Sequence, residues 1–161
     1  MTDRVNDDLL QRLRRFHDDY FPGVEDQFKT LVKDGQHPSI LFIGCSDSRI
    51  VPYLLTGTGP GELFIVRNVG AFVPPYDGSA GYHGTAAAIE FAVLNLRVSR
   101  IVVCGHTHCG GIRALYEETP AALTIWLHGS NLGARPRCRC ASPTKRCAAP
   151  SSVRWCSNWS A

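Results

Sequence analysis

The sequence predicts an α/β fold in which a parallel-core sheet is flanked by helices. Three short apolar runs, at residues 40–44, 63–66 and 101–105, alternate with segments of helical periodicity, an order that is typical of parallel sheets. The runs are apolar along their whole length, which indicates that both faces of the sheet are covered. Ligands of such sheets bind beyond the carboxyl ends of the strands, so the residues after these runs are the first candidates for chemistry.

Helices are expected before, between and after these strands. Residues 4–33 repeat apolar side chains at helical spacing, with an interruption by Phe-Pro-Gly at 21–23, and predict two helices before the first strand. Pro52 and three glycines make residues 52–61 a loop or a broken helix. Residues 84–97 predict a well-buried helix, and a further helix begins near residues 110–111.

The composition narrows the class of protein. The chain has 161 residues, of which 44% are hydrophobic and 19% charged, values that are ordinary for one soluble globular domain. It contains no apolar run near the ~18 residues that a membrane span needs, and its first eight residues are too polar and acidic for a secretory signal. We therefore expect a cytoplasmic protein without a membrane partner, in which cysteines serve as ligands or core thiols more often than as disulfides.

Charge is distributed unevenly along the chain. Residues 1–118 carry 11 Lys and Arg against 14 Asp and Glu, whereas residues 119–161 carry six basic residues and no acid. A basic tail can bind nucleic acid. This tail lacks dense basic clusters at helical spacing, so no nucleic-acid partner is expected.

Two short segments contain the residues best suited to bind a metal. Cys45-Ser-Asp-Ser-Arg follows the first apolar run and His106-Thr-His-Cys109 follows the third, so neighbouring strands would bring them together. Two thiolates and one imidazole suit zinc, which makes Cys45, His106 and Cys109 the expected ligands. Asp47 can assist a metal-activated water or take the fourth position itself, and a fork with Arg49 would hold it off the metal.

The stretches around these segments resemble the β-class carbonic anhydrases, in particular the plant-like branch. The resemblance runs from about residue 16 to about residue 120 and is carried by GQHPSILFIGCSDSRIVP, GELFIVRNVGAFVPPYDG and GTAAAIEFAVLNLRVSRIVVCGHTHCGGI. It implies a zinc enzyme that reversibly hydrates carbon dioxide to bicarbonate and a proton. It also implies a helical arm that packs on a second copy, so the expected partners are this substrate pair and a homodimer or higher oligomer.

The resemblance also implies roles for single residues when it is carried over by position. Cys45, His106 and Cys109 would bind zinc, Asp47 would be the fourth ligand of a closed state, and Asp47 with Arg49 would form the catalytic dyad. The substrate would meet a bicarbonate hydrogen-bond donor, an apolar pocket partly contributed across the dimer, and a backbone amide near the anion. These are expected from Gln36, from Phe64, Val69 and Phe91, and from Gly110, respectively.

The resemblance stops near residue 127. We expect residues 1–127 to be an incomplete carbonic-anhydrase-like zinc domain that lacks the C-terminal part of the family fold. Residues 128–161 are expected to be a disordered basic tail rich in Cys, Ser and Arg, foreign to the domain or read out of frame. Since the ligands precede this boundary, the alternative function is a non-catalytic zinc-binding remnant, and a weaker third one is a basic-tailed binding module.

Overall fold

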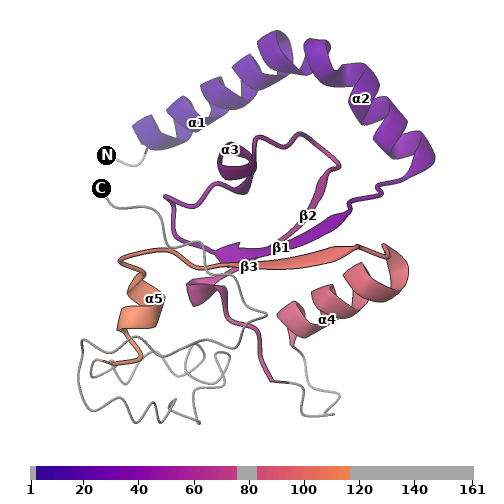
Figure 1. The fold of residues 1–161 in the computed structure, drawn as a ribbon. Coiled ribbons are helices and arrows are strands. Elements are labelled where there is room, and N and C mark those ends of the chain that lie inside the picture. The colour runs from indigo at the N-terminus through magenta and orange to yellow at the C-terminus, as the bar shows by residue number, and fades with distance from the viewer. Residues whose placement is uncertain (1–2, 76–82, 117–161) are drawn as a thin grey trace.

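The three strands form one parallel sheet in the order β2-β1-β3, with helices on both sides of it (Figure 1). The structure is a computed structural model that describes residues 3–75 and 83–116. Strand β1 (Ile40–Cys45) pairs with β2 (Leu63–Asn68) and with β3 (Arg100–Cys104), both in parallel. The predicted α/β fold with a parallel sheet is confirmed, and each strand begins and ends within two residues of its predicted bounds.

The centre of the core lies around β1. Five of its six residues are buried. Leu41 and Ile43 pack against Ala92, and partly buried apolar side chains surround this cluster: Phe64, Val66, Ile89 and Val98. The register pairs Cys45 with Asn68 of β2 and Gly44 with Cys104 of β3, so the carboxyl ends of all three strands lie at one edge of the sheet.

The N-terminal arm is a continuous helical segment in place of the predicted interrupted one. It consists of α1 (Asp3–Arg15), a π-helical turn at Phe16–Tyr20, and α2 (Phe21–Asp34), and it arches over one side of the sheet (Figure 1). The expected break at residues 21–23 falls within the first turn of α2, where a proline costs no hydrogen bond. The Phe21 N–H donates to the Phe16 carbonyl, five residues earlier, so a π turn stands where a break was predicted.

The remaining helices are short. The broken helix expected at 52–61 is α3 (Pro52–Thr56), and α5 (Gly110–Arg113) begins where predicted. Between them, α4 (Gly84–Glu90) continues into a second π turn at Phe91–Asn95. None of the described helices is long and apolar enough to cross a bilayer.

The expectation of a well-buried helix at 84–97 is wrong. Within that range only Ala92 is buried, while Leu94 is 70% exposed. The outer strand β3 is exposed as well, since Ile101, Val102 and Val103 are all at least 39% exposed. Among the described residues, the two-sided cover predicted for every strand therefore holds for the central strand β1 and not for the outer strands β2 and β3.

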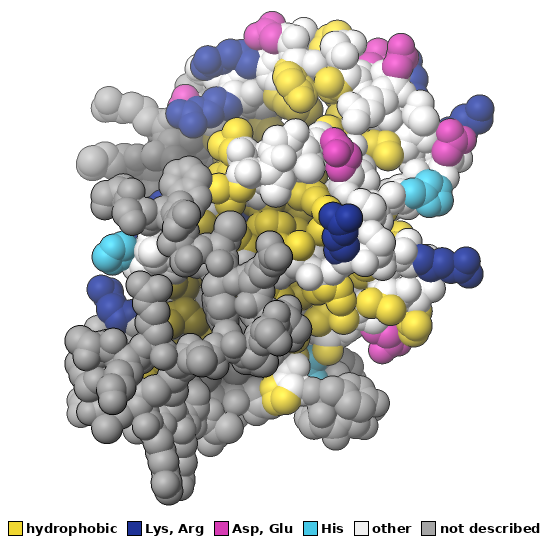
Figure 2. Space-filling model, viewed as in Figure 1, with side chains coloured by type: hydrophobic (Ala, Val, Ile, Leu, Met, Phe, Trp, Pro, Cys, Tyr) yellow, Lys and Arg dark blue, Asp and Glu magenta, His cyan; other side chains and the backbone are white. Residues whose placement is uncertain are grey.

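The arm also carries an exposed apolar stripe. Leu9, Leu10, Leu13 and Phe16 recur at helical spacing and are each at least 45% exposed. Hydrophobic side chains gather over the middle of the face drawn in Figure 2, below the arm. The described residues therefore leave apolar surface uncovered. The expected tail at 128–161, together with residues 117–127, lies outside the described residues.

Candidate metal centre

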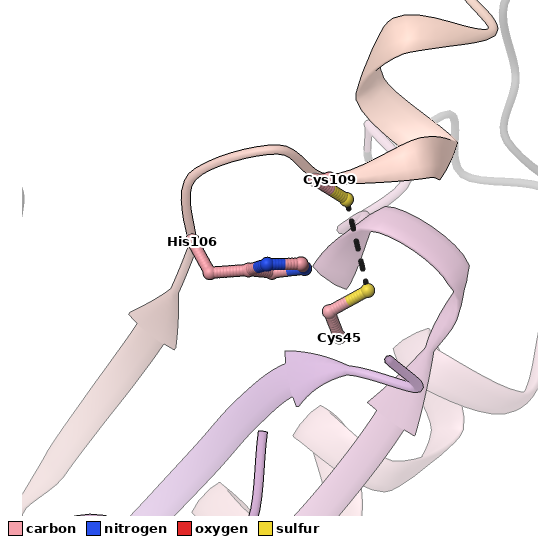
Figure 3. Close-up of side chains that lie close together, drawn as sticks. All are labelled: Cys45, His106 and Cys109. Carbon is pink, nitrogen blue, oxygen red and sulfur yellow. Dashed lines mark hydrogen bonds between the residues drawn. The ribbon is translucent and has the colours of Figure 1, made fainter. Parts of the chain in front are cut away.

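Cys45, His106 and Cys109 converge at the carboxyl edge of the sheet (Figure 3). One ligand atom from each lies within 4.8 Å of the other two, and the two sulfur atoms are 3.7 Å apart. Both cysteines are buried, and the His106 side chain is 9% exposed. The structure thus brings together the three ligands expected from two distant segments.

The geometry of this group fits zinc. Two sulfur atoms at ~2.3 Å from one tetrahedral zinc ion lie about 3.8 Å apart, close to the observed separation of 3.7 Å. The His106 Nε2 atom is buried and has no hydrogen-bond partner among the described residues. Nδ1 lies 3.0 Å from the Thr107 carbonyl oxygen, which can only accept, so Nδ1 carries the proton and Nε2 presents a lone pair.

Local backbone conformation brings the side chains of Cys45 and Cys109 towards each other at the carboxyl edge of the sheet. Cys45 is the last residue of β1, and the Ser46 N–H continues the ladder to the Asn68 carbonyl. In the second segment His108 has a left-handed backbone, with φ of 54°, a conformation in which histidine is enriched among non-glycine residues. This turn ends at Cys109, the extended residue before α5.

The two thiols differ in the hydrogen bonds that they receive. Burial opposes ionisation of Cys45, but N–H groups of Asp47 and Gly70 donate to its sulfur at 3.4 and 3.3 Å. Together with the neighbouring side chains of His106 and Cys109, these donors outweigh burial and lower the pKa of Cys45 to about 7. For Cys109 burial dominates and raises the pKa. Cys45 is therefore ionised at a lower pH than Cys109, and its thiolate is the more available of the two to bind a cation.

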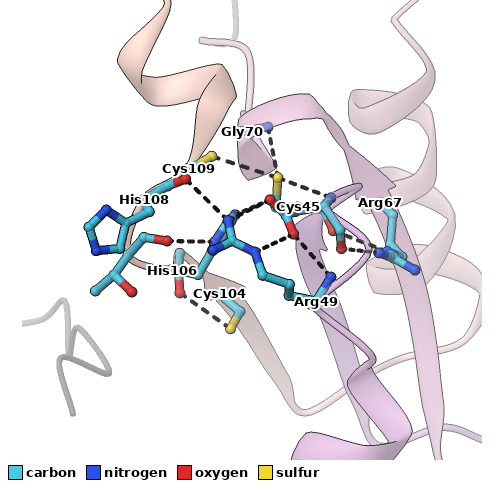
Figure 4. A network of polar contacts seen from close by, with 11 residues as sticks. Cys45, Arg49, Arg67, Gly70, Cys104, His106, His108 and Cys109 are labelled. Atoms are coloured by element: carbon cyan, nitrogen blue, oxygen red, sulfur yellow. Dashed lines mark hydrogen bonds and ion pairs between the residues drawn. The ribbon is translucent and has the colours of Figure 1, made fainter. Parts of the chain in front are cut away.

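Arg49, labelled in Figure 4, holds Asp47 beside the group by a two-point ion pair. Arg49 donates from Nε to Oδ1 at 2.9 Å and from Nη2 to Oδ2 at 2.8 Å, and its backbone N–H also donates to Oδ1. These hydrogen bonds hold the pKa of Asp47 well below its usual range. Oδ2 lies 3.9 Å from His106 Nε2, so the carboxylate lies beside the Cys45, His106 and Cys109 group. Arg49 donates hydrogen bonds to both of its oxygens. A closed state with Asp47 as fourth ligand stays a prediction.

Of the expected substrate residues, Val69 and Gly110 lie at the same edge. Gly110 directly follows Cys109, one of the expected ligands, and opens α5. Val69 directly follows β2 and packs against the start of α5, since a Cβ on Gly111 would lie 2.8 Å from its Cγ1. Either residue can therefore border a molecule bound beside Cys45, His106 and Cys109.

Phe64, Phe91 and Gln36 lie elsewhere in this chain. Phe64 is in register with Leu41, four residues before Cys45 and therefore about 13 Å along the strand. Its ring packs on Phe91 at a centroid distance of 5.8 Å. Gln36 precedes β1 and lines a hollow of about 710 Å³ between the arm and the loop after α3. One chain alone does not bring these three residues to the ligands.

Sequence reasoning missed several residues of the site, all at the end of β2. The Asn68 side chain accepts from the Phe72 N–H at 2.6 Å and donates to the Phe72 carbonyl at 2.9 Å, which closes the turn that carries Gly70. Arg67 donates to the Cys45 and Asp47 carbonyls. The same rule that singled out the ends of β1 and β3 could have found them, because β2 ends at the same edge.

Comparison with known proteins gives a family for this fold and site. The family model described as carbonic anhydrase matches residues 40–139. The chain belongs to the β-carbonic anhydrase family. It is 48% identical over 109 residues to the carbonic anhydrase of Synechococcus elongatus, a match that covers 68% of this chain and 39% of the relative.

Solved β-carbonic anhydrases share the fold. The structure of the β-carbonic anhydrase CcaA matches with a TM-score of 0.69 at 39% identity, over 80% of this chain and 58% of that one. One of two tetrameric β-carbonic anhydrases from Sordaria macrospora matches with a TM-score of 0.52 at 33% identity, over 78% of this chain and 59% of that one. This β-carbonic anhydrase chain therefore spans less than two thirds of the length of each relative named here.

Proposed function

We propose that this chain binds zinc through Cys45, His106 and Cys109 and catalyses the reversible hydration of carbon dioxide to bicarbonate and a proton. The observation that carries the proposal is the Cys-His-Cys group, with both cysteines buried and an ion-paired carboxylate at its border. Three protein ligands leave one position for a reacting molecule, which is typical of catalytic zinc. Zinc in this position would supply a Lewis acid that makes water more acidic.

Asp47 and Arg49 would orient the attacking water. Arg49 fixes the carboxylate by two hydrogen bonds, at 2.8 and 2.9 Å, and keeps it ionised and thus an acceptor. An acceptor of fixed position can receive one hydrogen bond from water and direct its oxygen towards carbon dioxide. Because the pKa of Asp47 is held low, this carboxylate is a weak base, and we propose that the proton leaves to buffer.

The substrate pocket would be completed by a second copy of the chain. Val69 and the Gly110 amide lie beside the ligands, whereas Gln36, Phe64 and Phe91 lie towards other parts of the same chain. The exposed stripe of Leu9, Leu10, Leu13 and Phe16 offers apolar surface for such a copy. We propose a homodimer or a larger assembly in which these surfaces meet.

The alternative function is zinc binding without catalysis. It is favoured by the distance between the ligands and Phe64 in one chain, about 13 Å along β1, because a chain that does not associate would keep the metal group and lack the pocket. We propose further that residues 1–127 form the zinc domain, with 128–161 as a separate tail. A reducing, cytoplasmic location would keep Cys45 and Cys109 available to the metal.

Stopped-flow measurement of carbon dioxide hydration by the zinc-loaded chain tests the proposal. We expect rates above buffer that rise linearly with enzyme concentration, and a return to the buffer rate for Cys45→Ser. Zinc content is measured on the same samples. Full zinc occupancy with a rate equal to that of buffer would exclude catalysis and leave the zinc-binding alternative.

A further inference from the structure

Arg67, labelled in Figure 4, donates hydrogen bonds to the backbone of both Cys45 and Asp47. Its Nε donates to the carbonyl oxygen of the ligand Cys45 at 3.1 Å, and its Nη2 donates to the carbonyl oxygen of Asp47 at 2.8 Å. Arg67 lies opposite Gly44 in the register of β1 and β2. A side chain on the neighbouring strand thus reaches across the end of β1 to two peptide groups of the metal-binding segment.

These two carbonyls lie where β1 passes into an irregular turn. The turn places Cys45 Sγ towards the metal space, while the Asp47 carbonyl already accepts the Ile50 N–H at 2.9 Å. Arg67 therefore connects the last residue of the strand to the turn that follows it. Rotation of either peptide group would break one of its hydrogen bonds, so Arg67 couples the orientation of the ligand to that of the carboxylate residue.

The surroundings of Arg67 leave these contacts as its main interaction. Arg67 is exposed to solvent, and among the described residues no acidic side chain forms an ion pair with it. Neither apolar burial nor an ion pair within the described part of the chain links it to the core of the sheet. Its contribution is therefore local to residues 45–47.

We infer that Arg67 is a positioning residue that holds Cys45 in the arrangement that binds zinc and Asp47 in its place beside the metal group. The inference rests on the proposed function only in assigning zinc to this group. The planar guanidinium matters because its two donors reach two carbonyls at once, whereas a lysine ammonium offers a single point of charge. Arg67→Lys should therefore restore only part of what Arg67→Ala loses.

The experiment measures zinc binding in the full-length chain. Zinc affinity is determined by competition with a chromogenic chelator for wild type, Arg67→Ala, Arg67→Lys and Arg100→Ala. Arg100 is an exposed arginine at the start of β3, at the opposite edge of the sheet, and serves as the matched control. We expect Arg67→Ala to weaken zinc binding about 10- to 100-fold, as loss of an outer hydrogen-bond partner of a metal ligand does, with Arg67→Lys between and Arg100→Ala unchanged.

Two further readouts separate positioning from a general effect on folding. The absorption bands of the Co²⁺-substituted protein should shift in Arg67→Ala and stay as in wild type in Arg100→Ala. The thermal midpoint of the zinc-free protein should be the same in both variants. Equal zinc affinities and equal Co²⁺ spectra for the two alanine variants would overturn the role of Arg67, and so would an affinity loss fully matched by unfolding of the zinc-free chain.

The outcome is independent of catalysis. A wild-type chain that binds zinc and does not hydrate carbon dioxide would contradict the proposed enzyme and leave the positioning role intact. A wild-type enzyme whose zinc affinity is indifferent to Arg67 would contradict the positioning role alone.

Discussion

Arg49 and His108 are 59 residues apart in sequence, yet the Arg49 Nη2 atom donates to the His108 carbonyl oxygen at 3.1 Å. The same nitrogen donates to Asp47 Oδ2 at 2.8 Å. One guanidinium therefore ties the segment after β1 to the loop after β3. Because Cys45 directly precedes the first of these segments and His106 and Cys109 belong to the second, Arg49 joins the two halves of the metal group.

Replacement of Arg49 by Ala should lower carbon dioxide hydration by about 100-fold, the order expected when a group that orients the reactants is misplaced. Zinc should stay bound, because the Arg49 side chain donates to Asp47 and His108 and, unlike Arg67, to no carbonyl of Cys45, His106 or Cys109 in the described part of the chain. Stopped-flow rates and zinc content on the same samples provide the measurement. Loss of zinc from the variant would mean that the contact with His108 serves mainly to hold the site together.

The two thiols should titrate at different pH in the zinc-free protein. A thiol with lowered pKa is a thiolate at lower pH, so alkylation of Cys45 should reach half its maximal rate near pH 7. Cys109, whose pKa burial raises, should stay protonated and react slowly until the solution is alkaline. Peptide-resolved mass spectrometry after brief iodoacetamide treatment from pH 5 to 10 follows each cysteine. Coincident pH profiles for the two would contradict the assignment of the Asp47 and Gly70 N–H groups as donors to Cys45.

A methyl group at Gly111 should disturb the site, while one at Gly110 should not disturb packing. A Cβ on Gly111 would lie 2.8 Å from Val69 Cγ1 and 3.1 Å from the Gly70 nitrogen, whereas a Cβ on Gly110 meets no atom within 4 Å. Gly111→Ala should thus cost about 1–3 kcal/mol of unfolding free energy, as overpacking does. Urea unfolding of the zinc-free chain measures this, with Gly110→Ala as its neighbour control. Equal stabilities of the two variants would show that the Val69–Gly70 turn yields without cost.

The apolar stripe of the arm should mediate association. Leu13 is 55% exposed, and burial of a leucine side chain contributes about 1.5–3 kcal/mol. Leu13→Glu should therefore weaken the proposed dimer at least about 10-fold, whereas Arg14→Glu, which adds an acid one residue away, should leave it intact. Sedimentation velocity over a range of protein concentrations measures both. A monomeric wild type, or equal dissociation of the two variants, would mean that this stripe is not the contact surface.

The sheet and the ligand group could be predicted from sequence because local signals specify them. Apolar runs bounded by turn residues predict the strands, and the rule that parallel strands end at one edge brings Cys45 to Cys109. The π turns at Phe16–Tyr20 and Phe91–Asn95 could not be predicted, because one extra residue in a helical turn barely alters apolar periodicity. The backbone contacts of Arg67 also depend on register: a shift of one residue would turn its side chain to the other face of the sheet.

The exposure of β3 and of the helix at 84–95 escaped prediction for a different reason. Hydrophobic patterning reports which residues prefer burial, and it carries no information on whether a given chain supplies the cover. Ile101, Val102 and Val103 follow the pattern of a buried strand, and the part of the chain that the structure describes leaves them exposed.

Cys45 and Cys109 lie 64 positions apart in the chain, with their sulfur atoms 3.7 Å from each other. An ion held by both would act as a removable cross-link that closes a loop of this length. In the chain-entropy treatment of cross-links such a closure restricts the unfolded chain by about 4 kcal/mol. Zinc at this position would thus stabilise the folded sheet as well as take part in the reaction, since it would join the central strand to the segment beyond β3. A chelator would then loosen the parallel sheet together with the site.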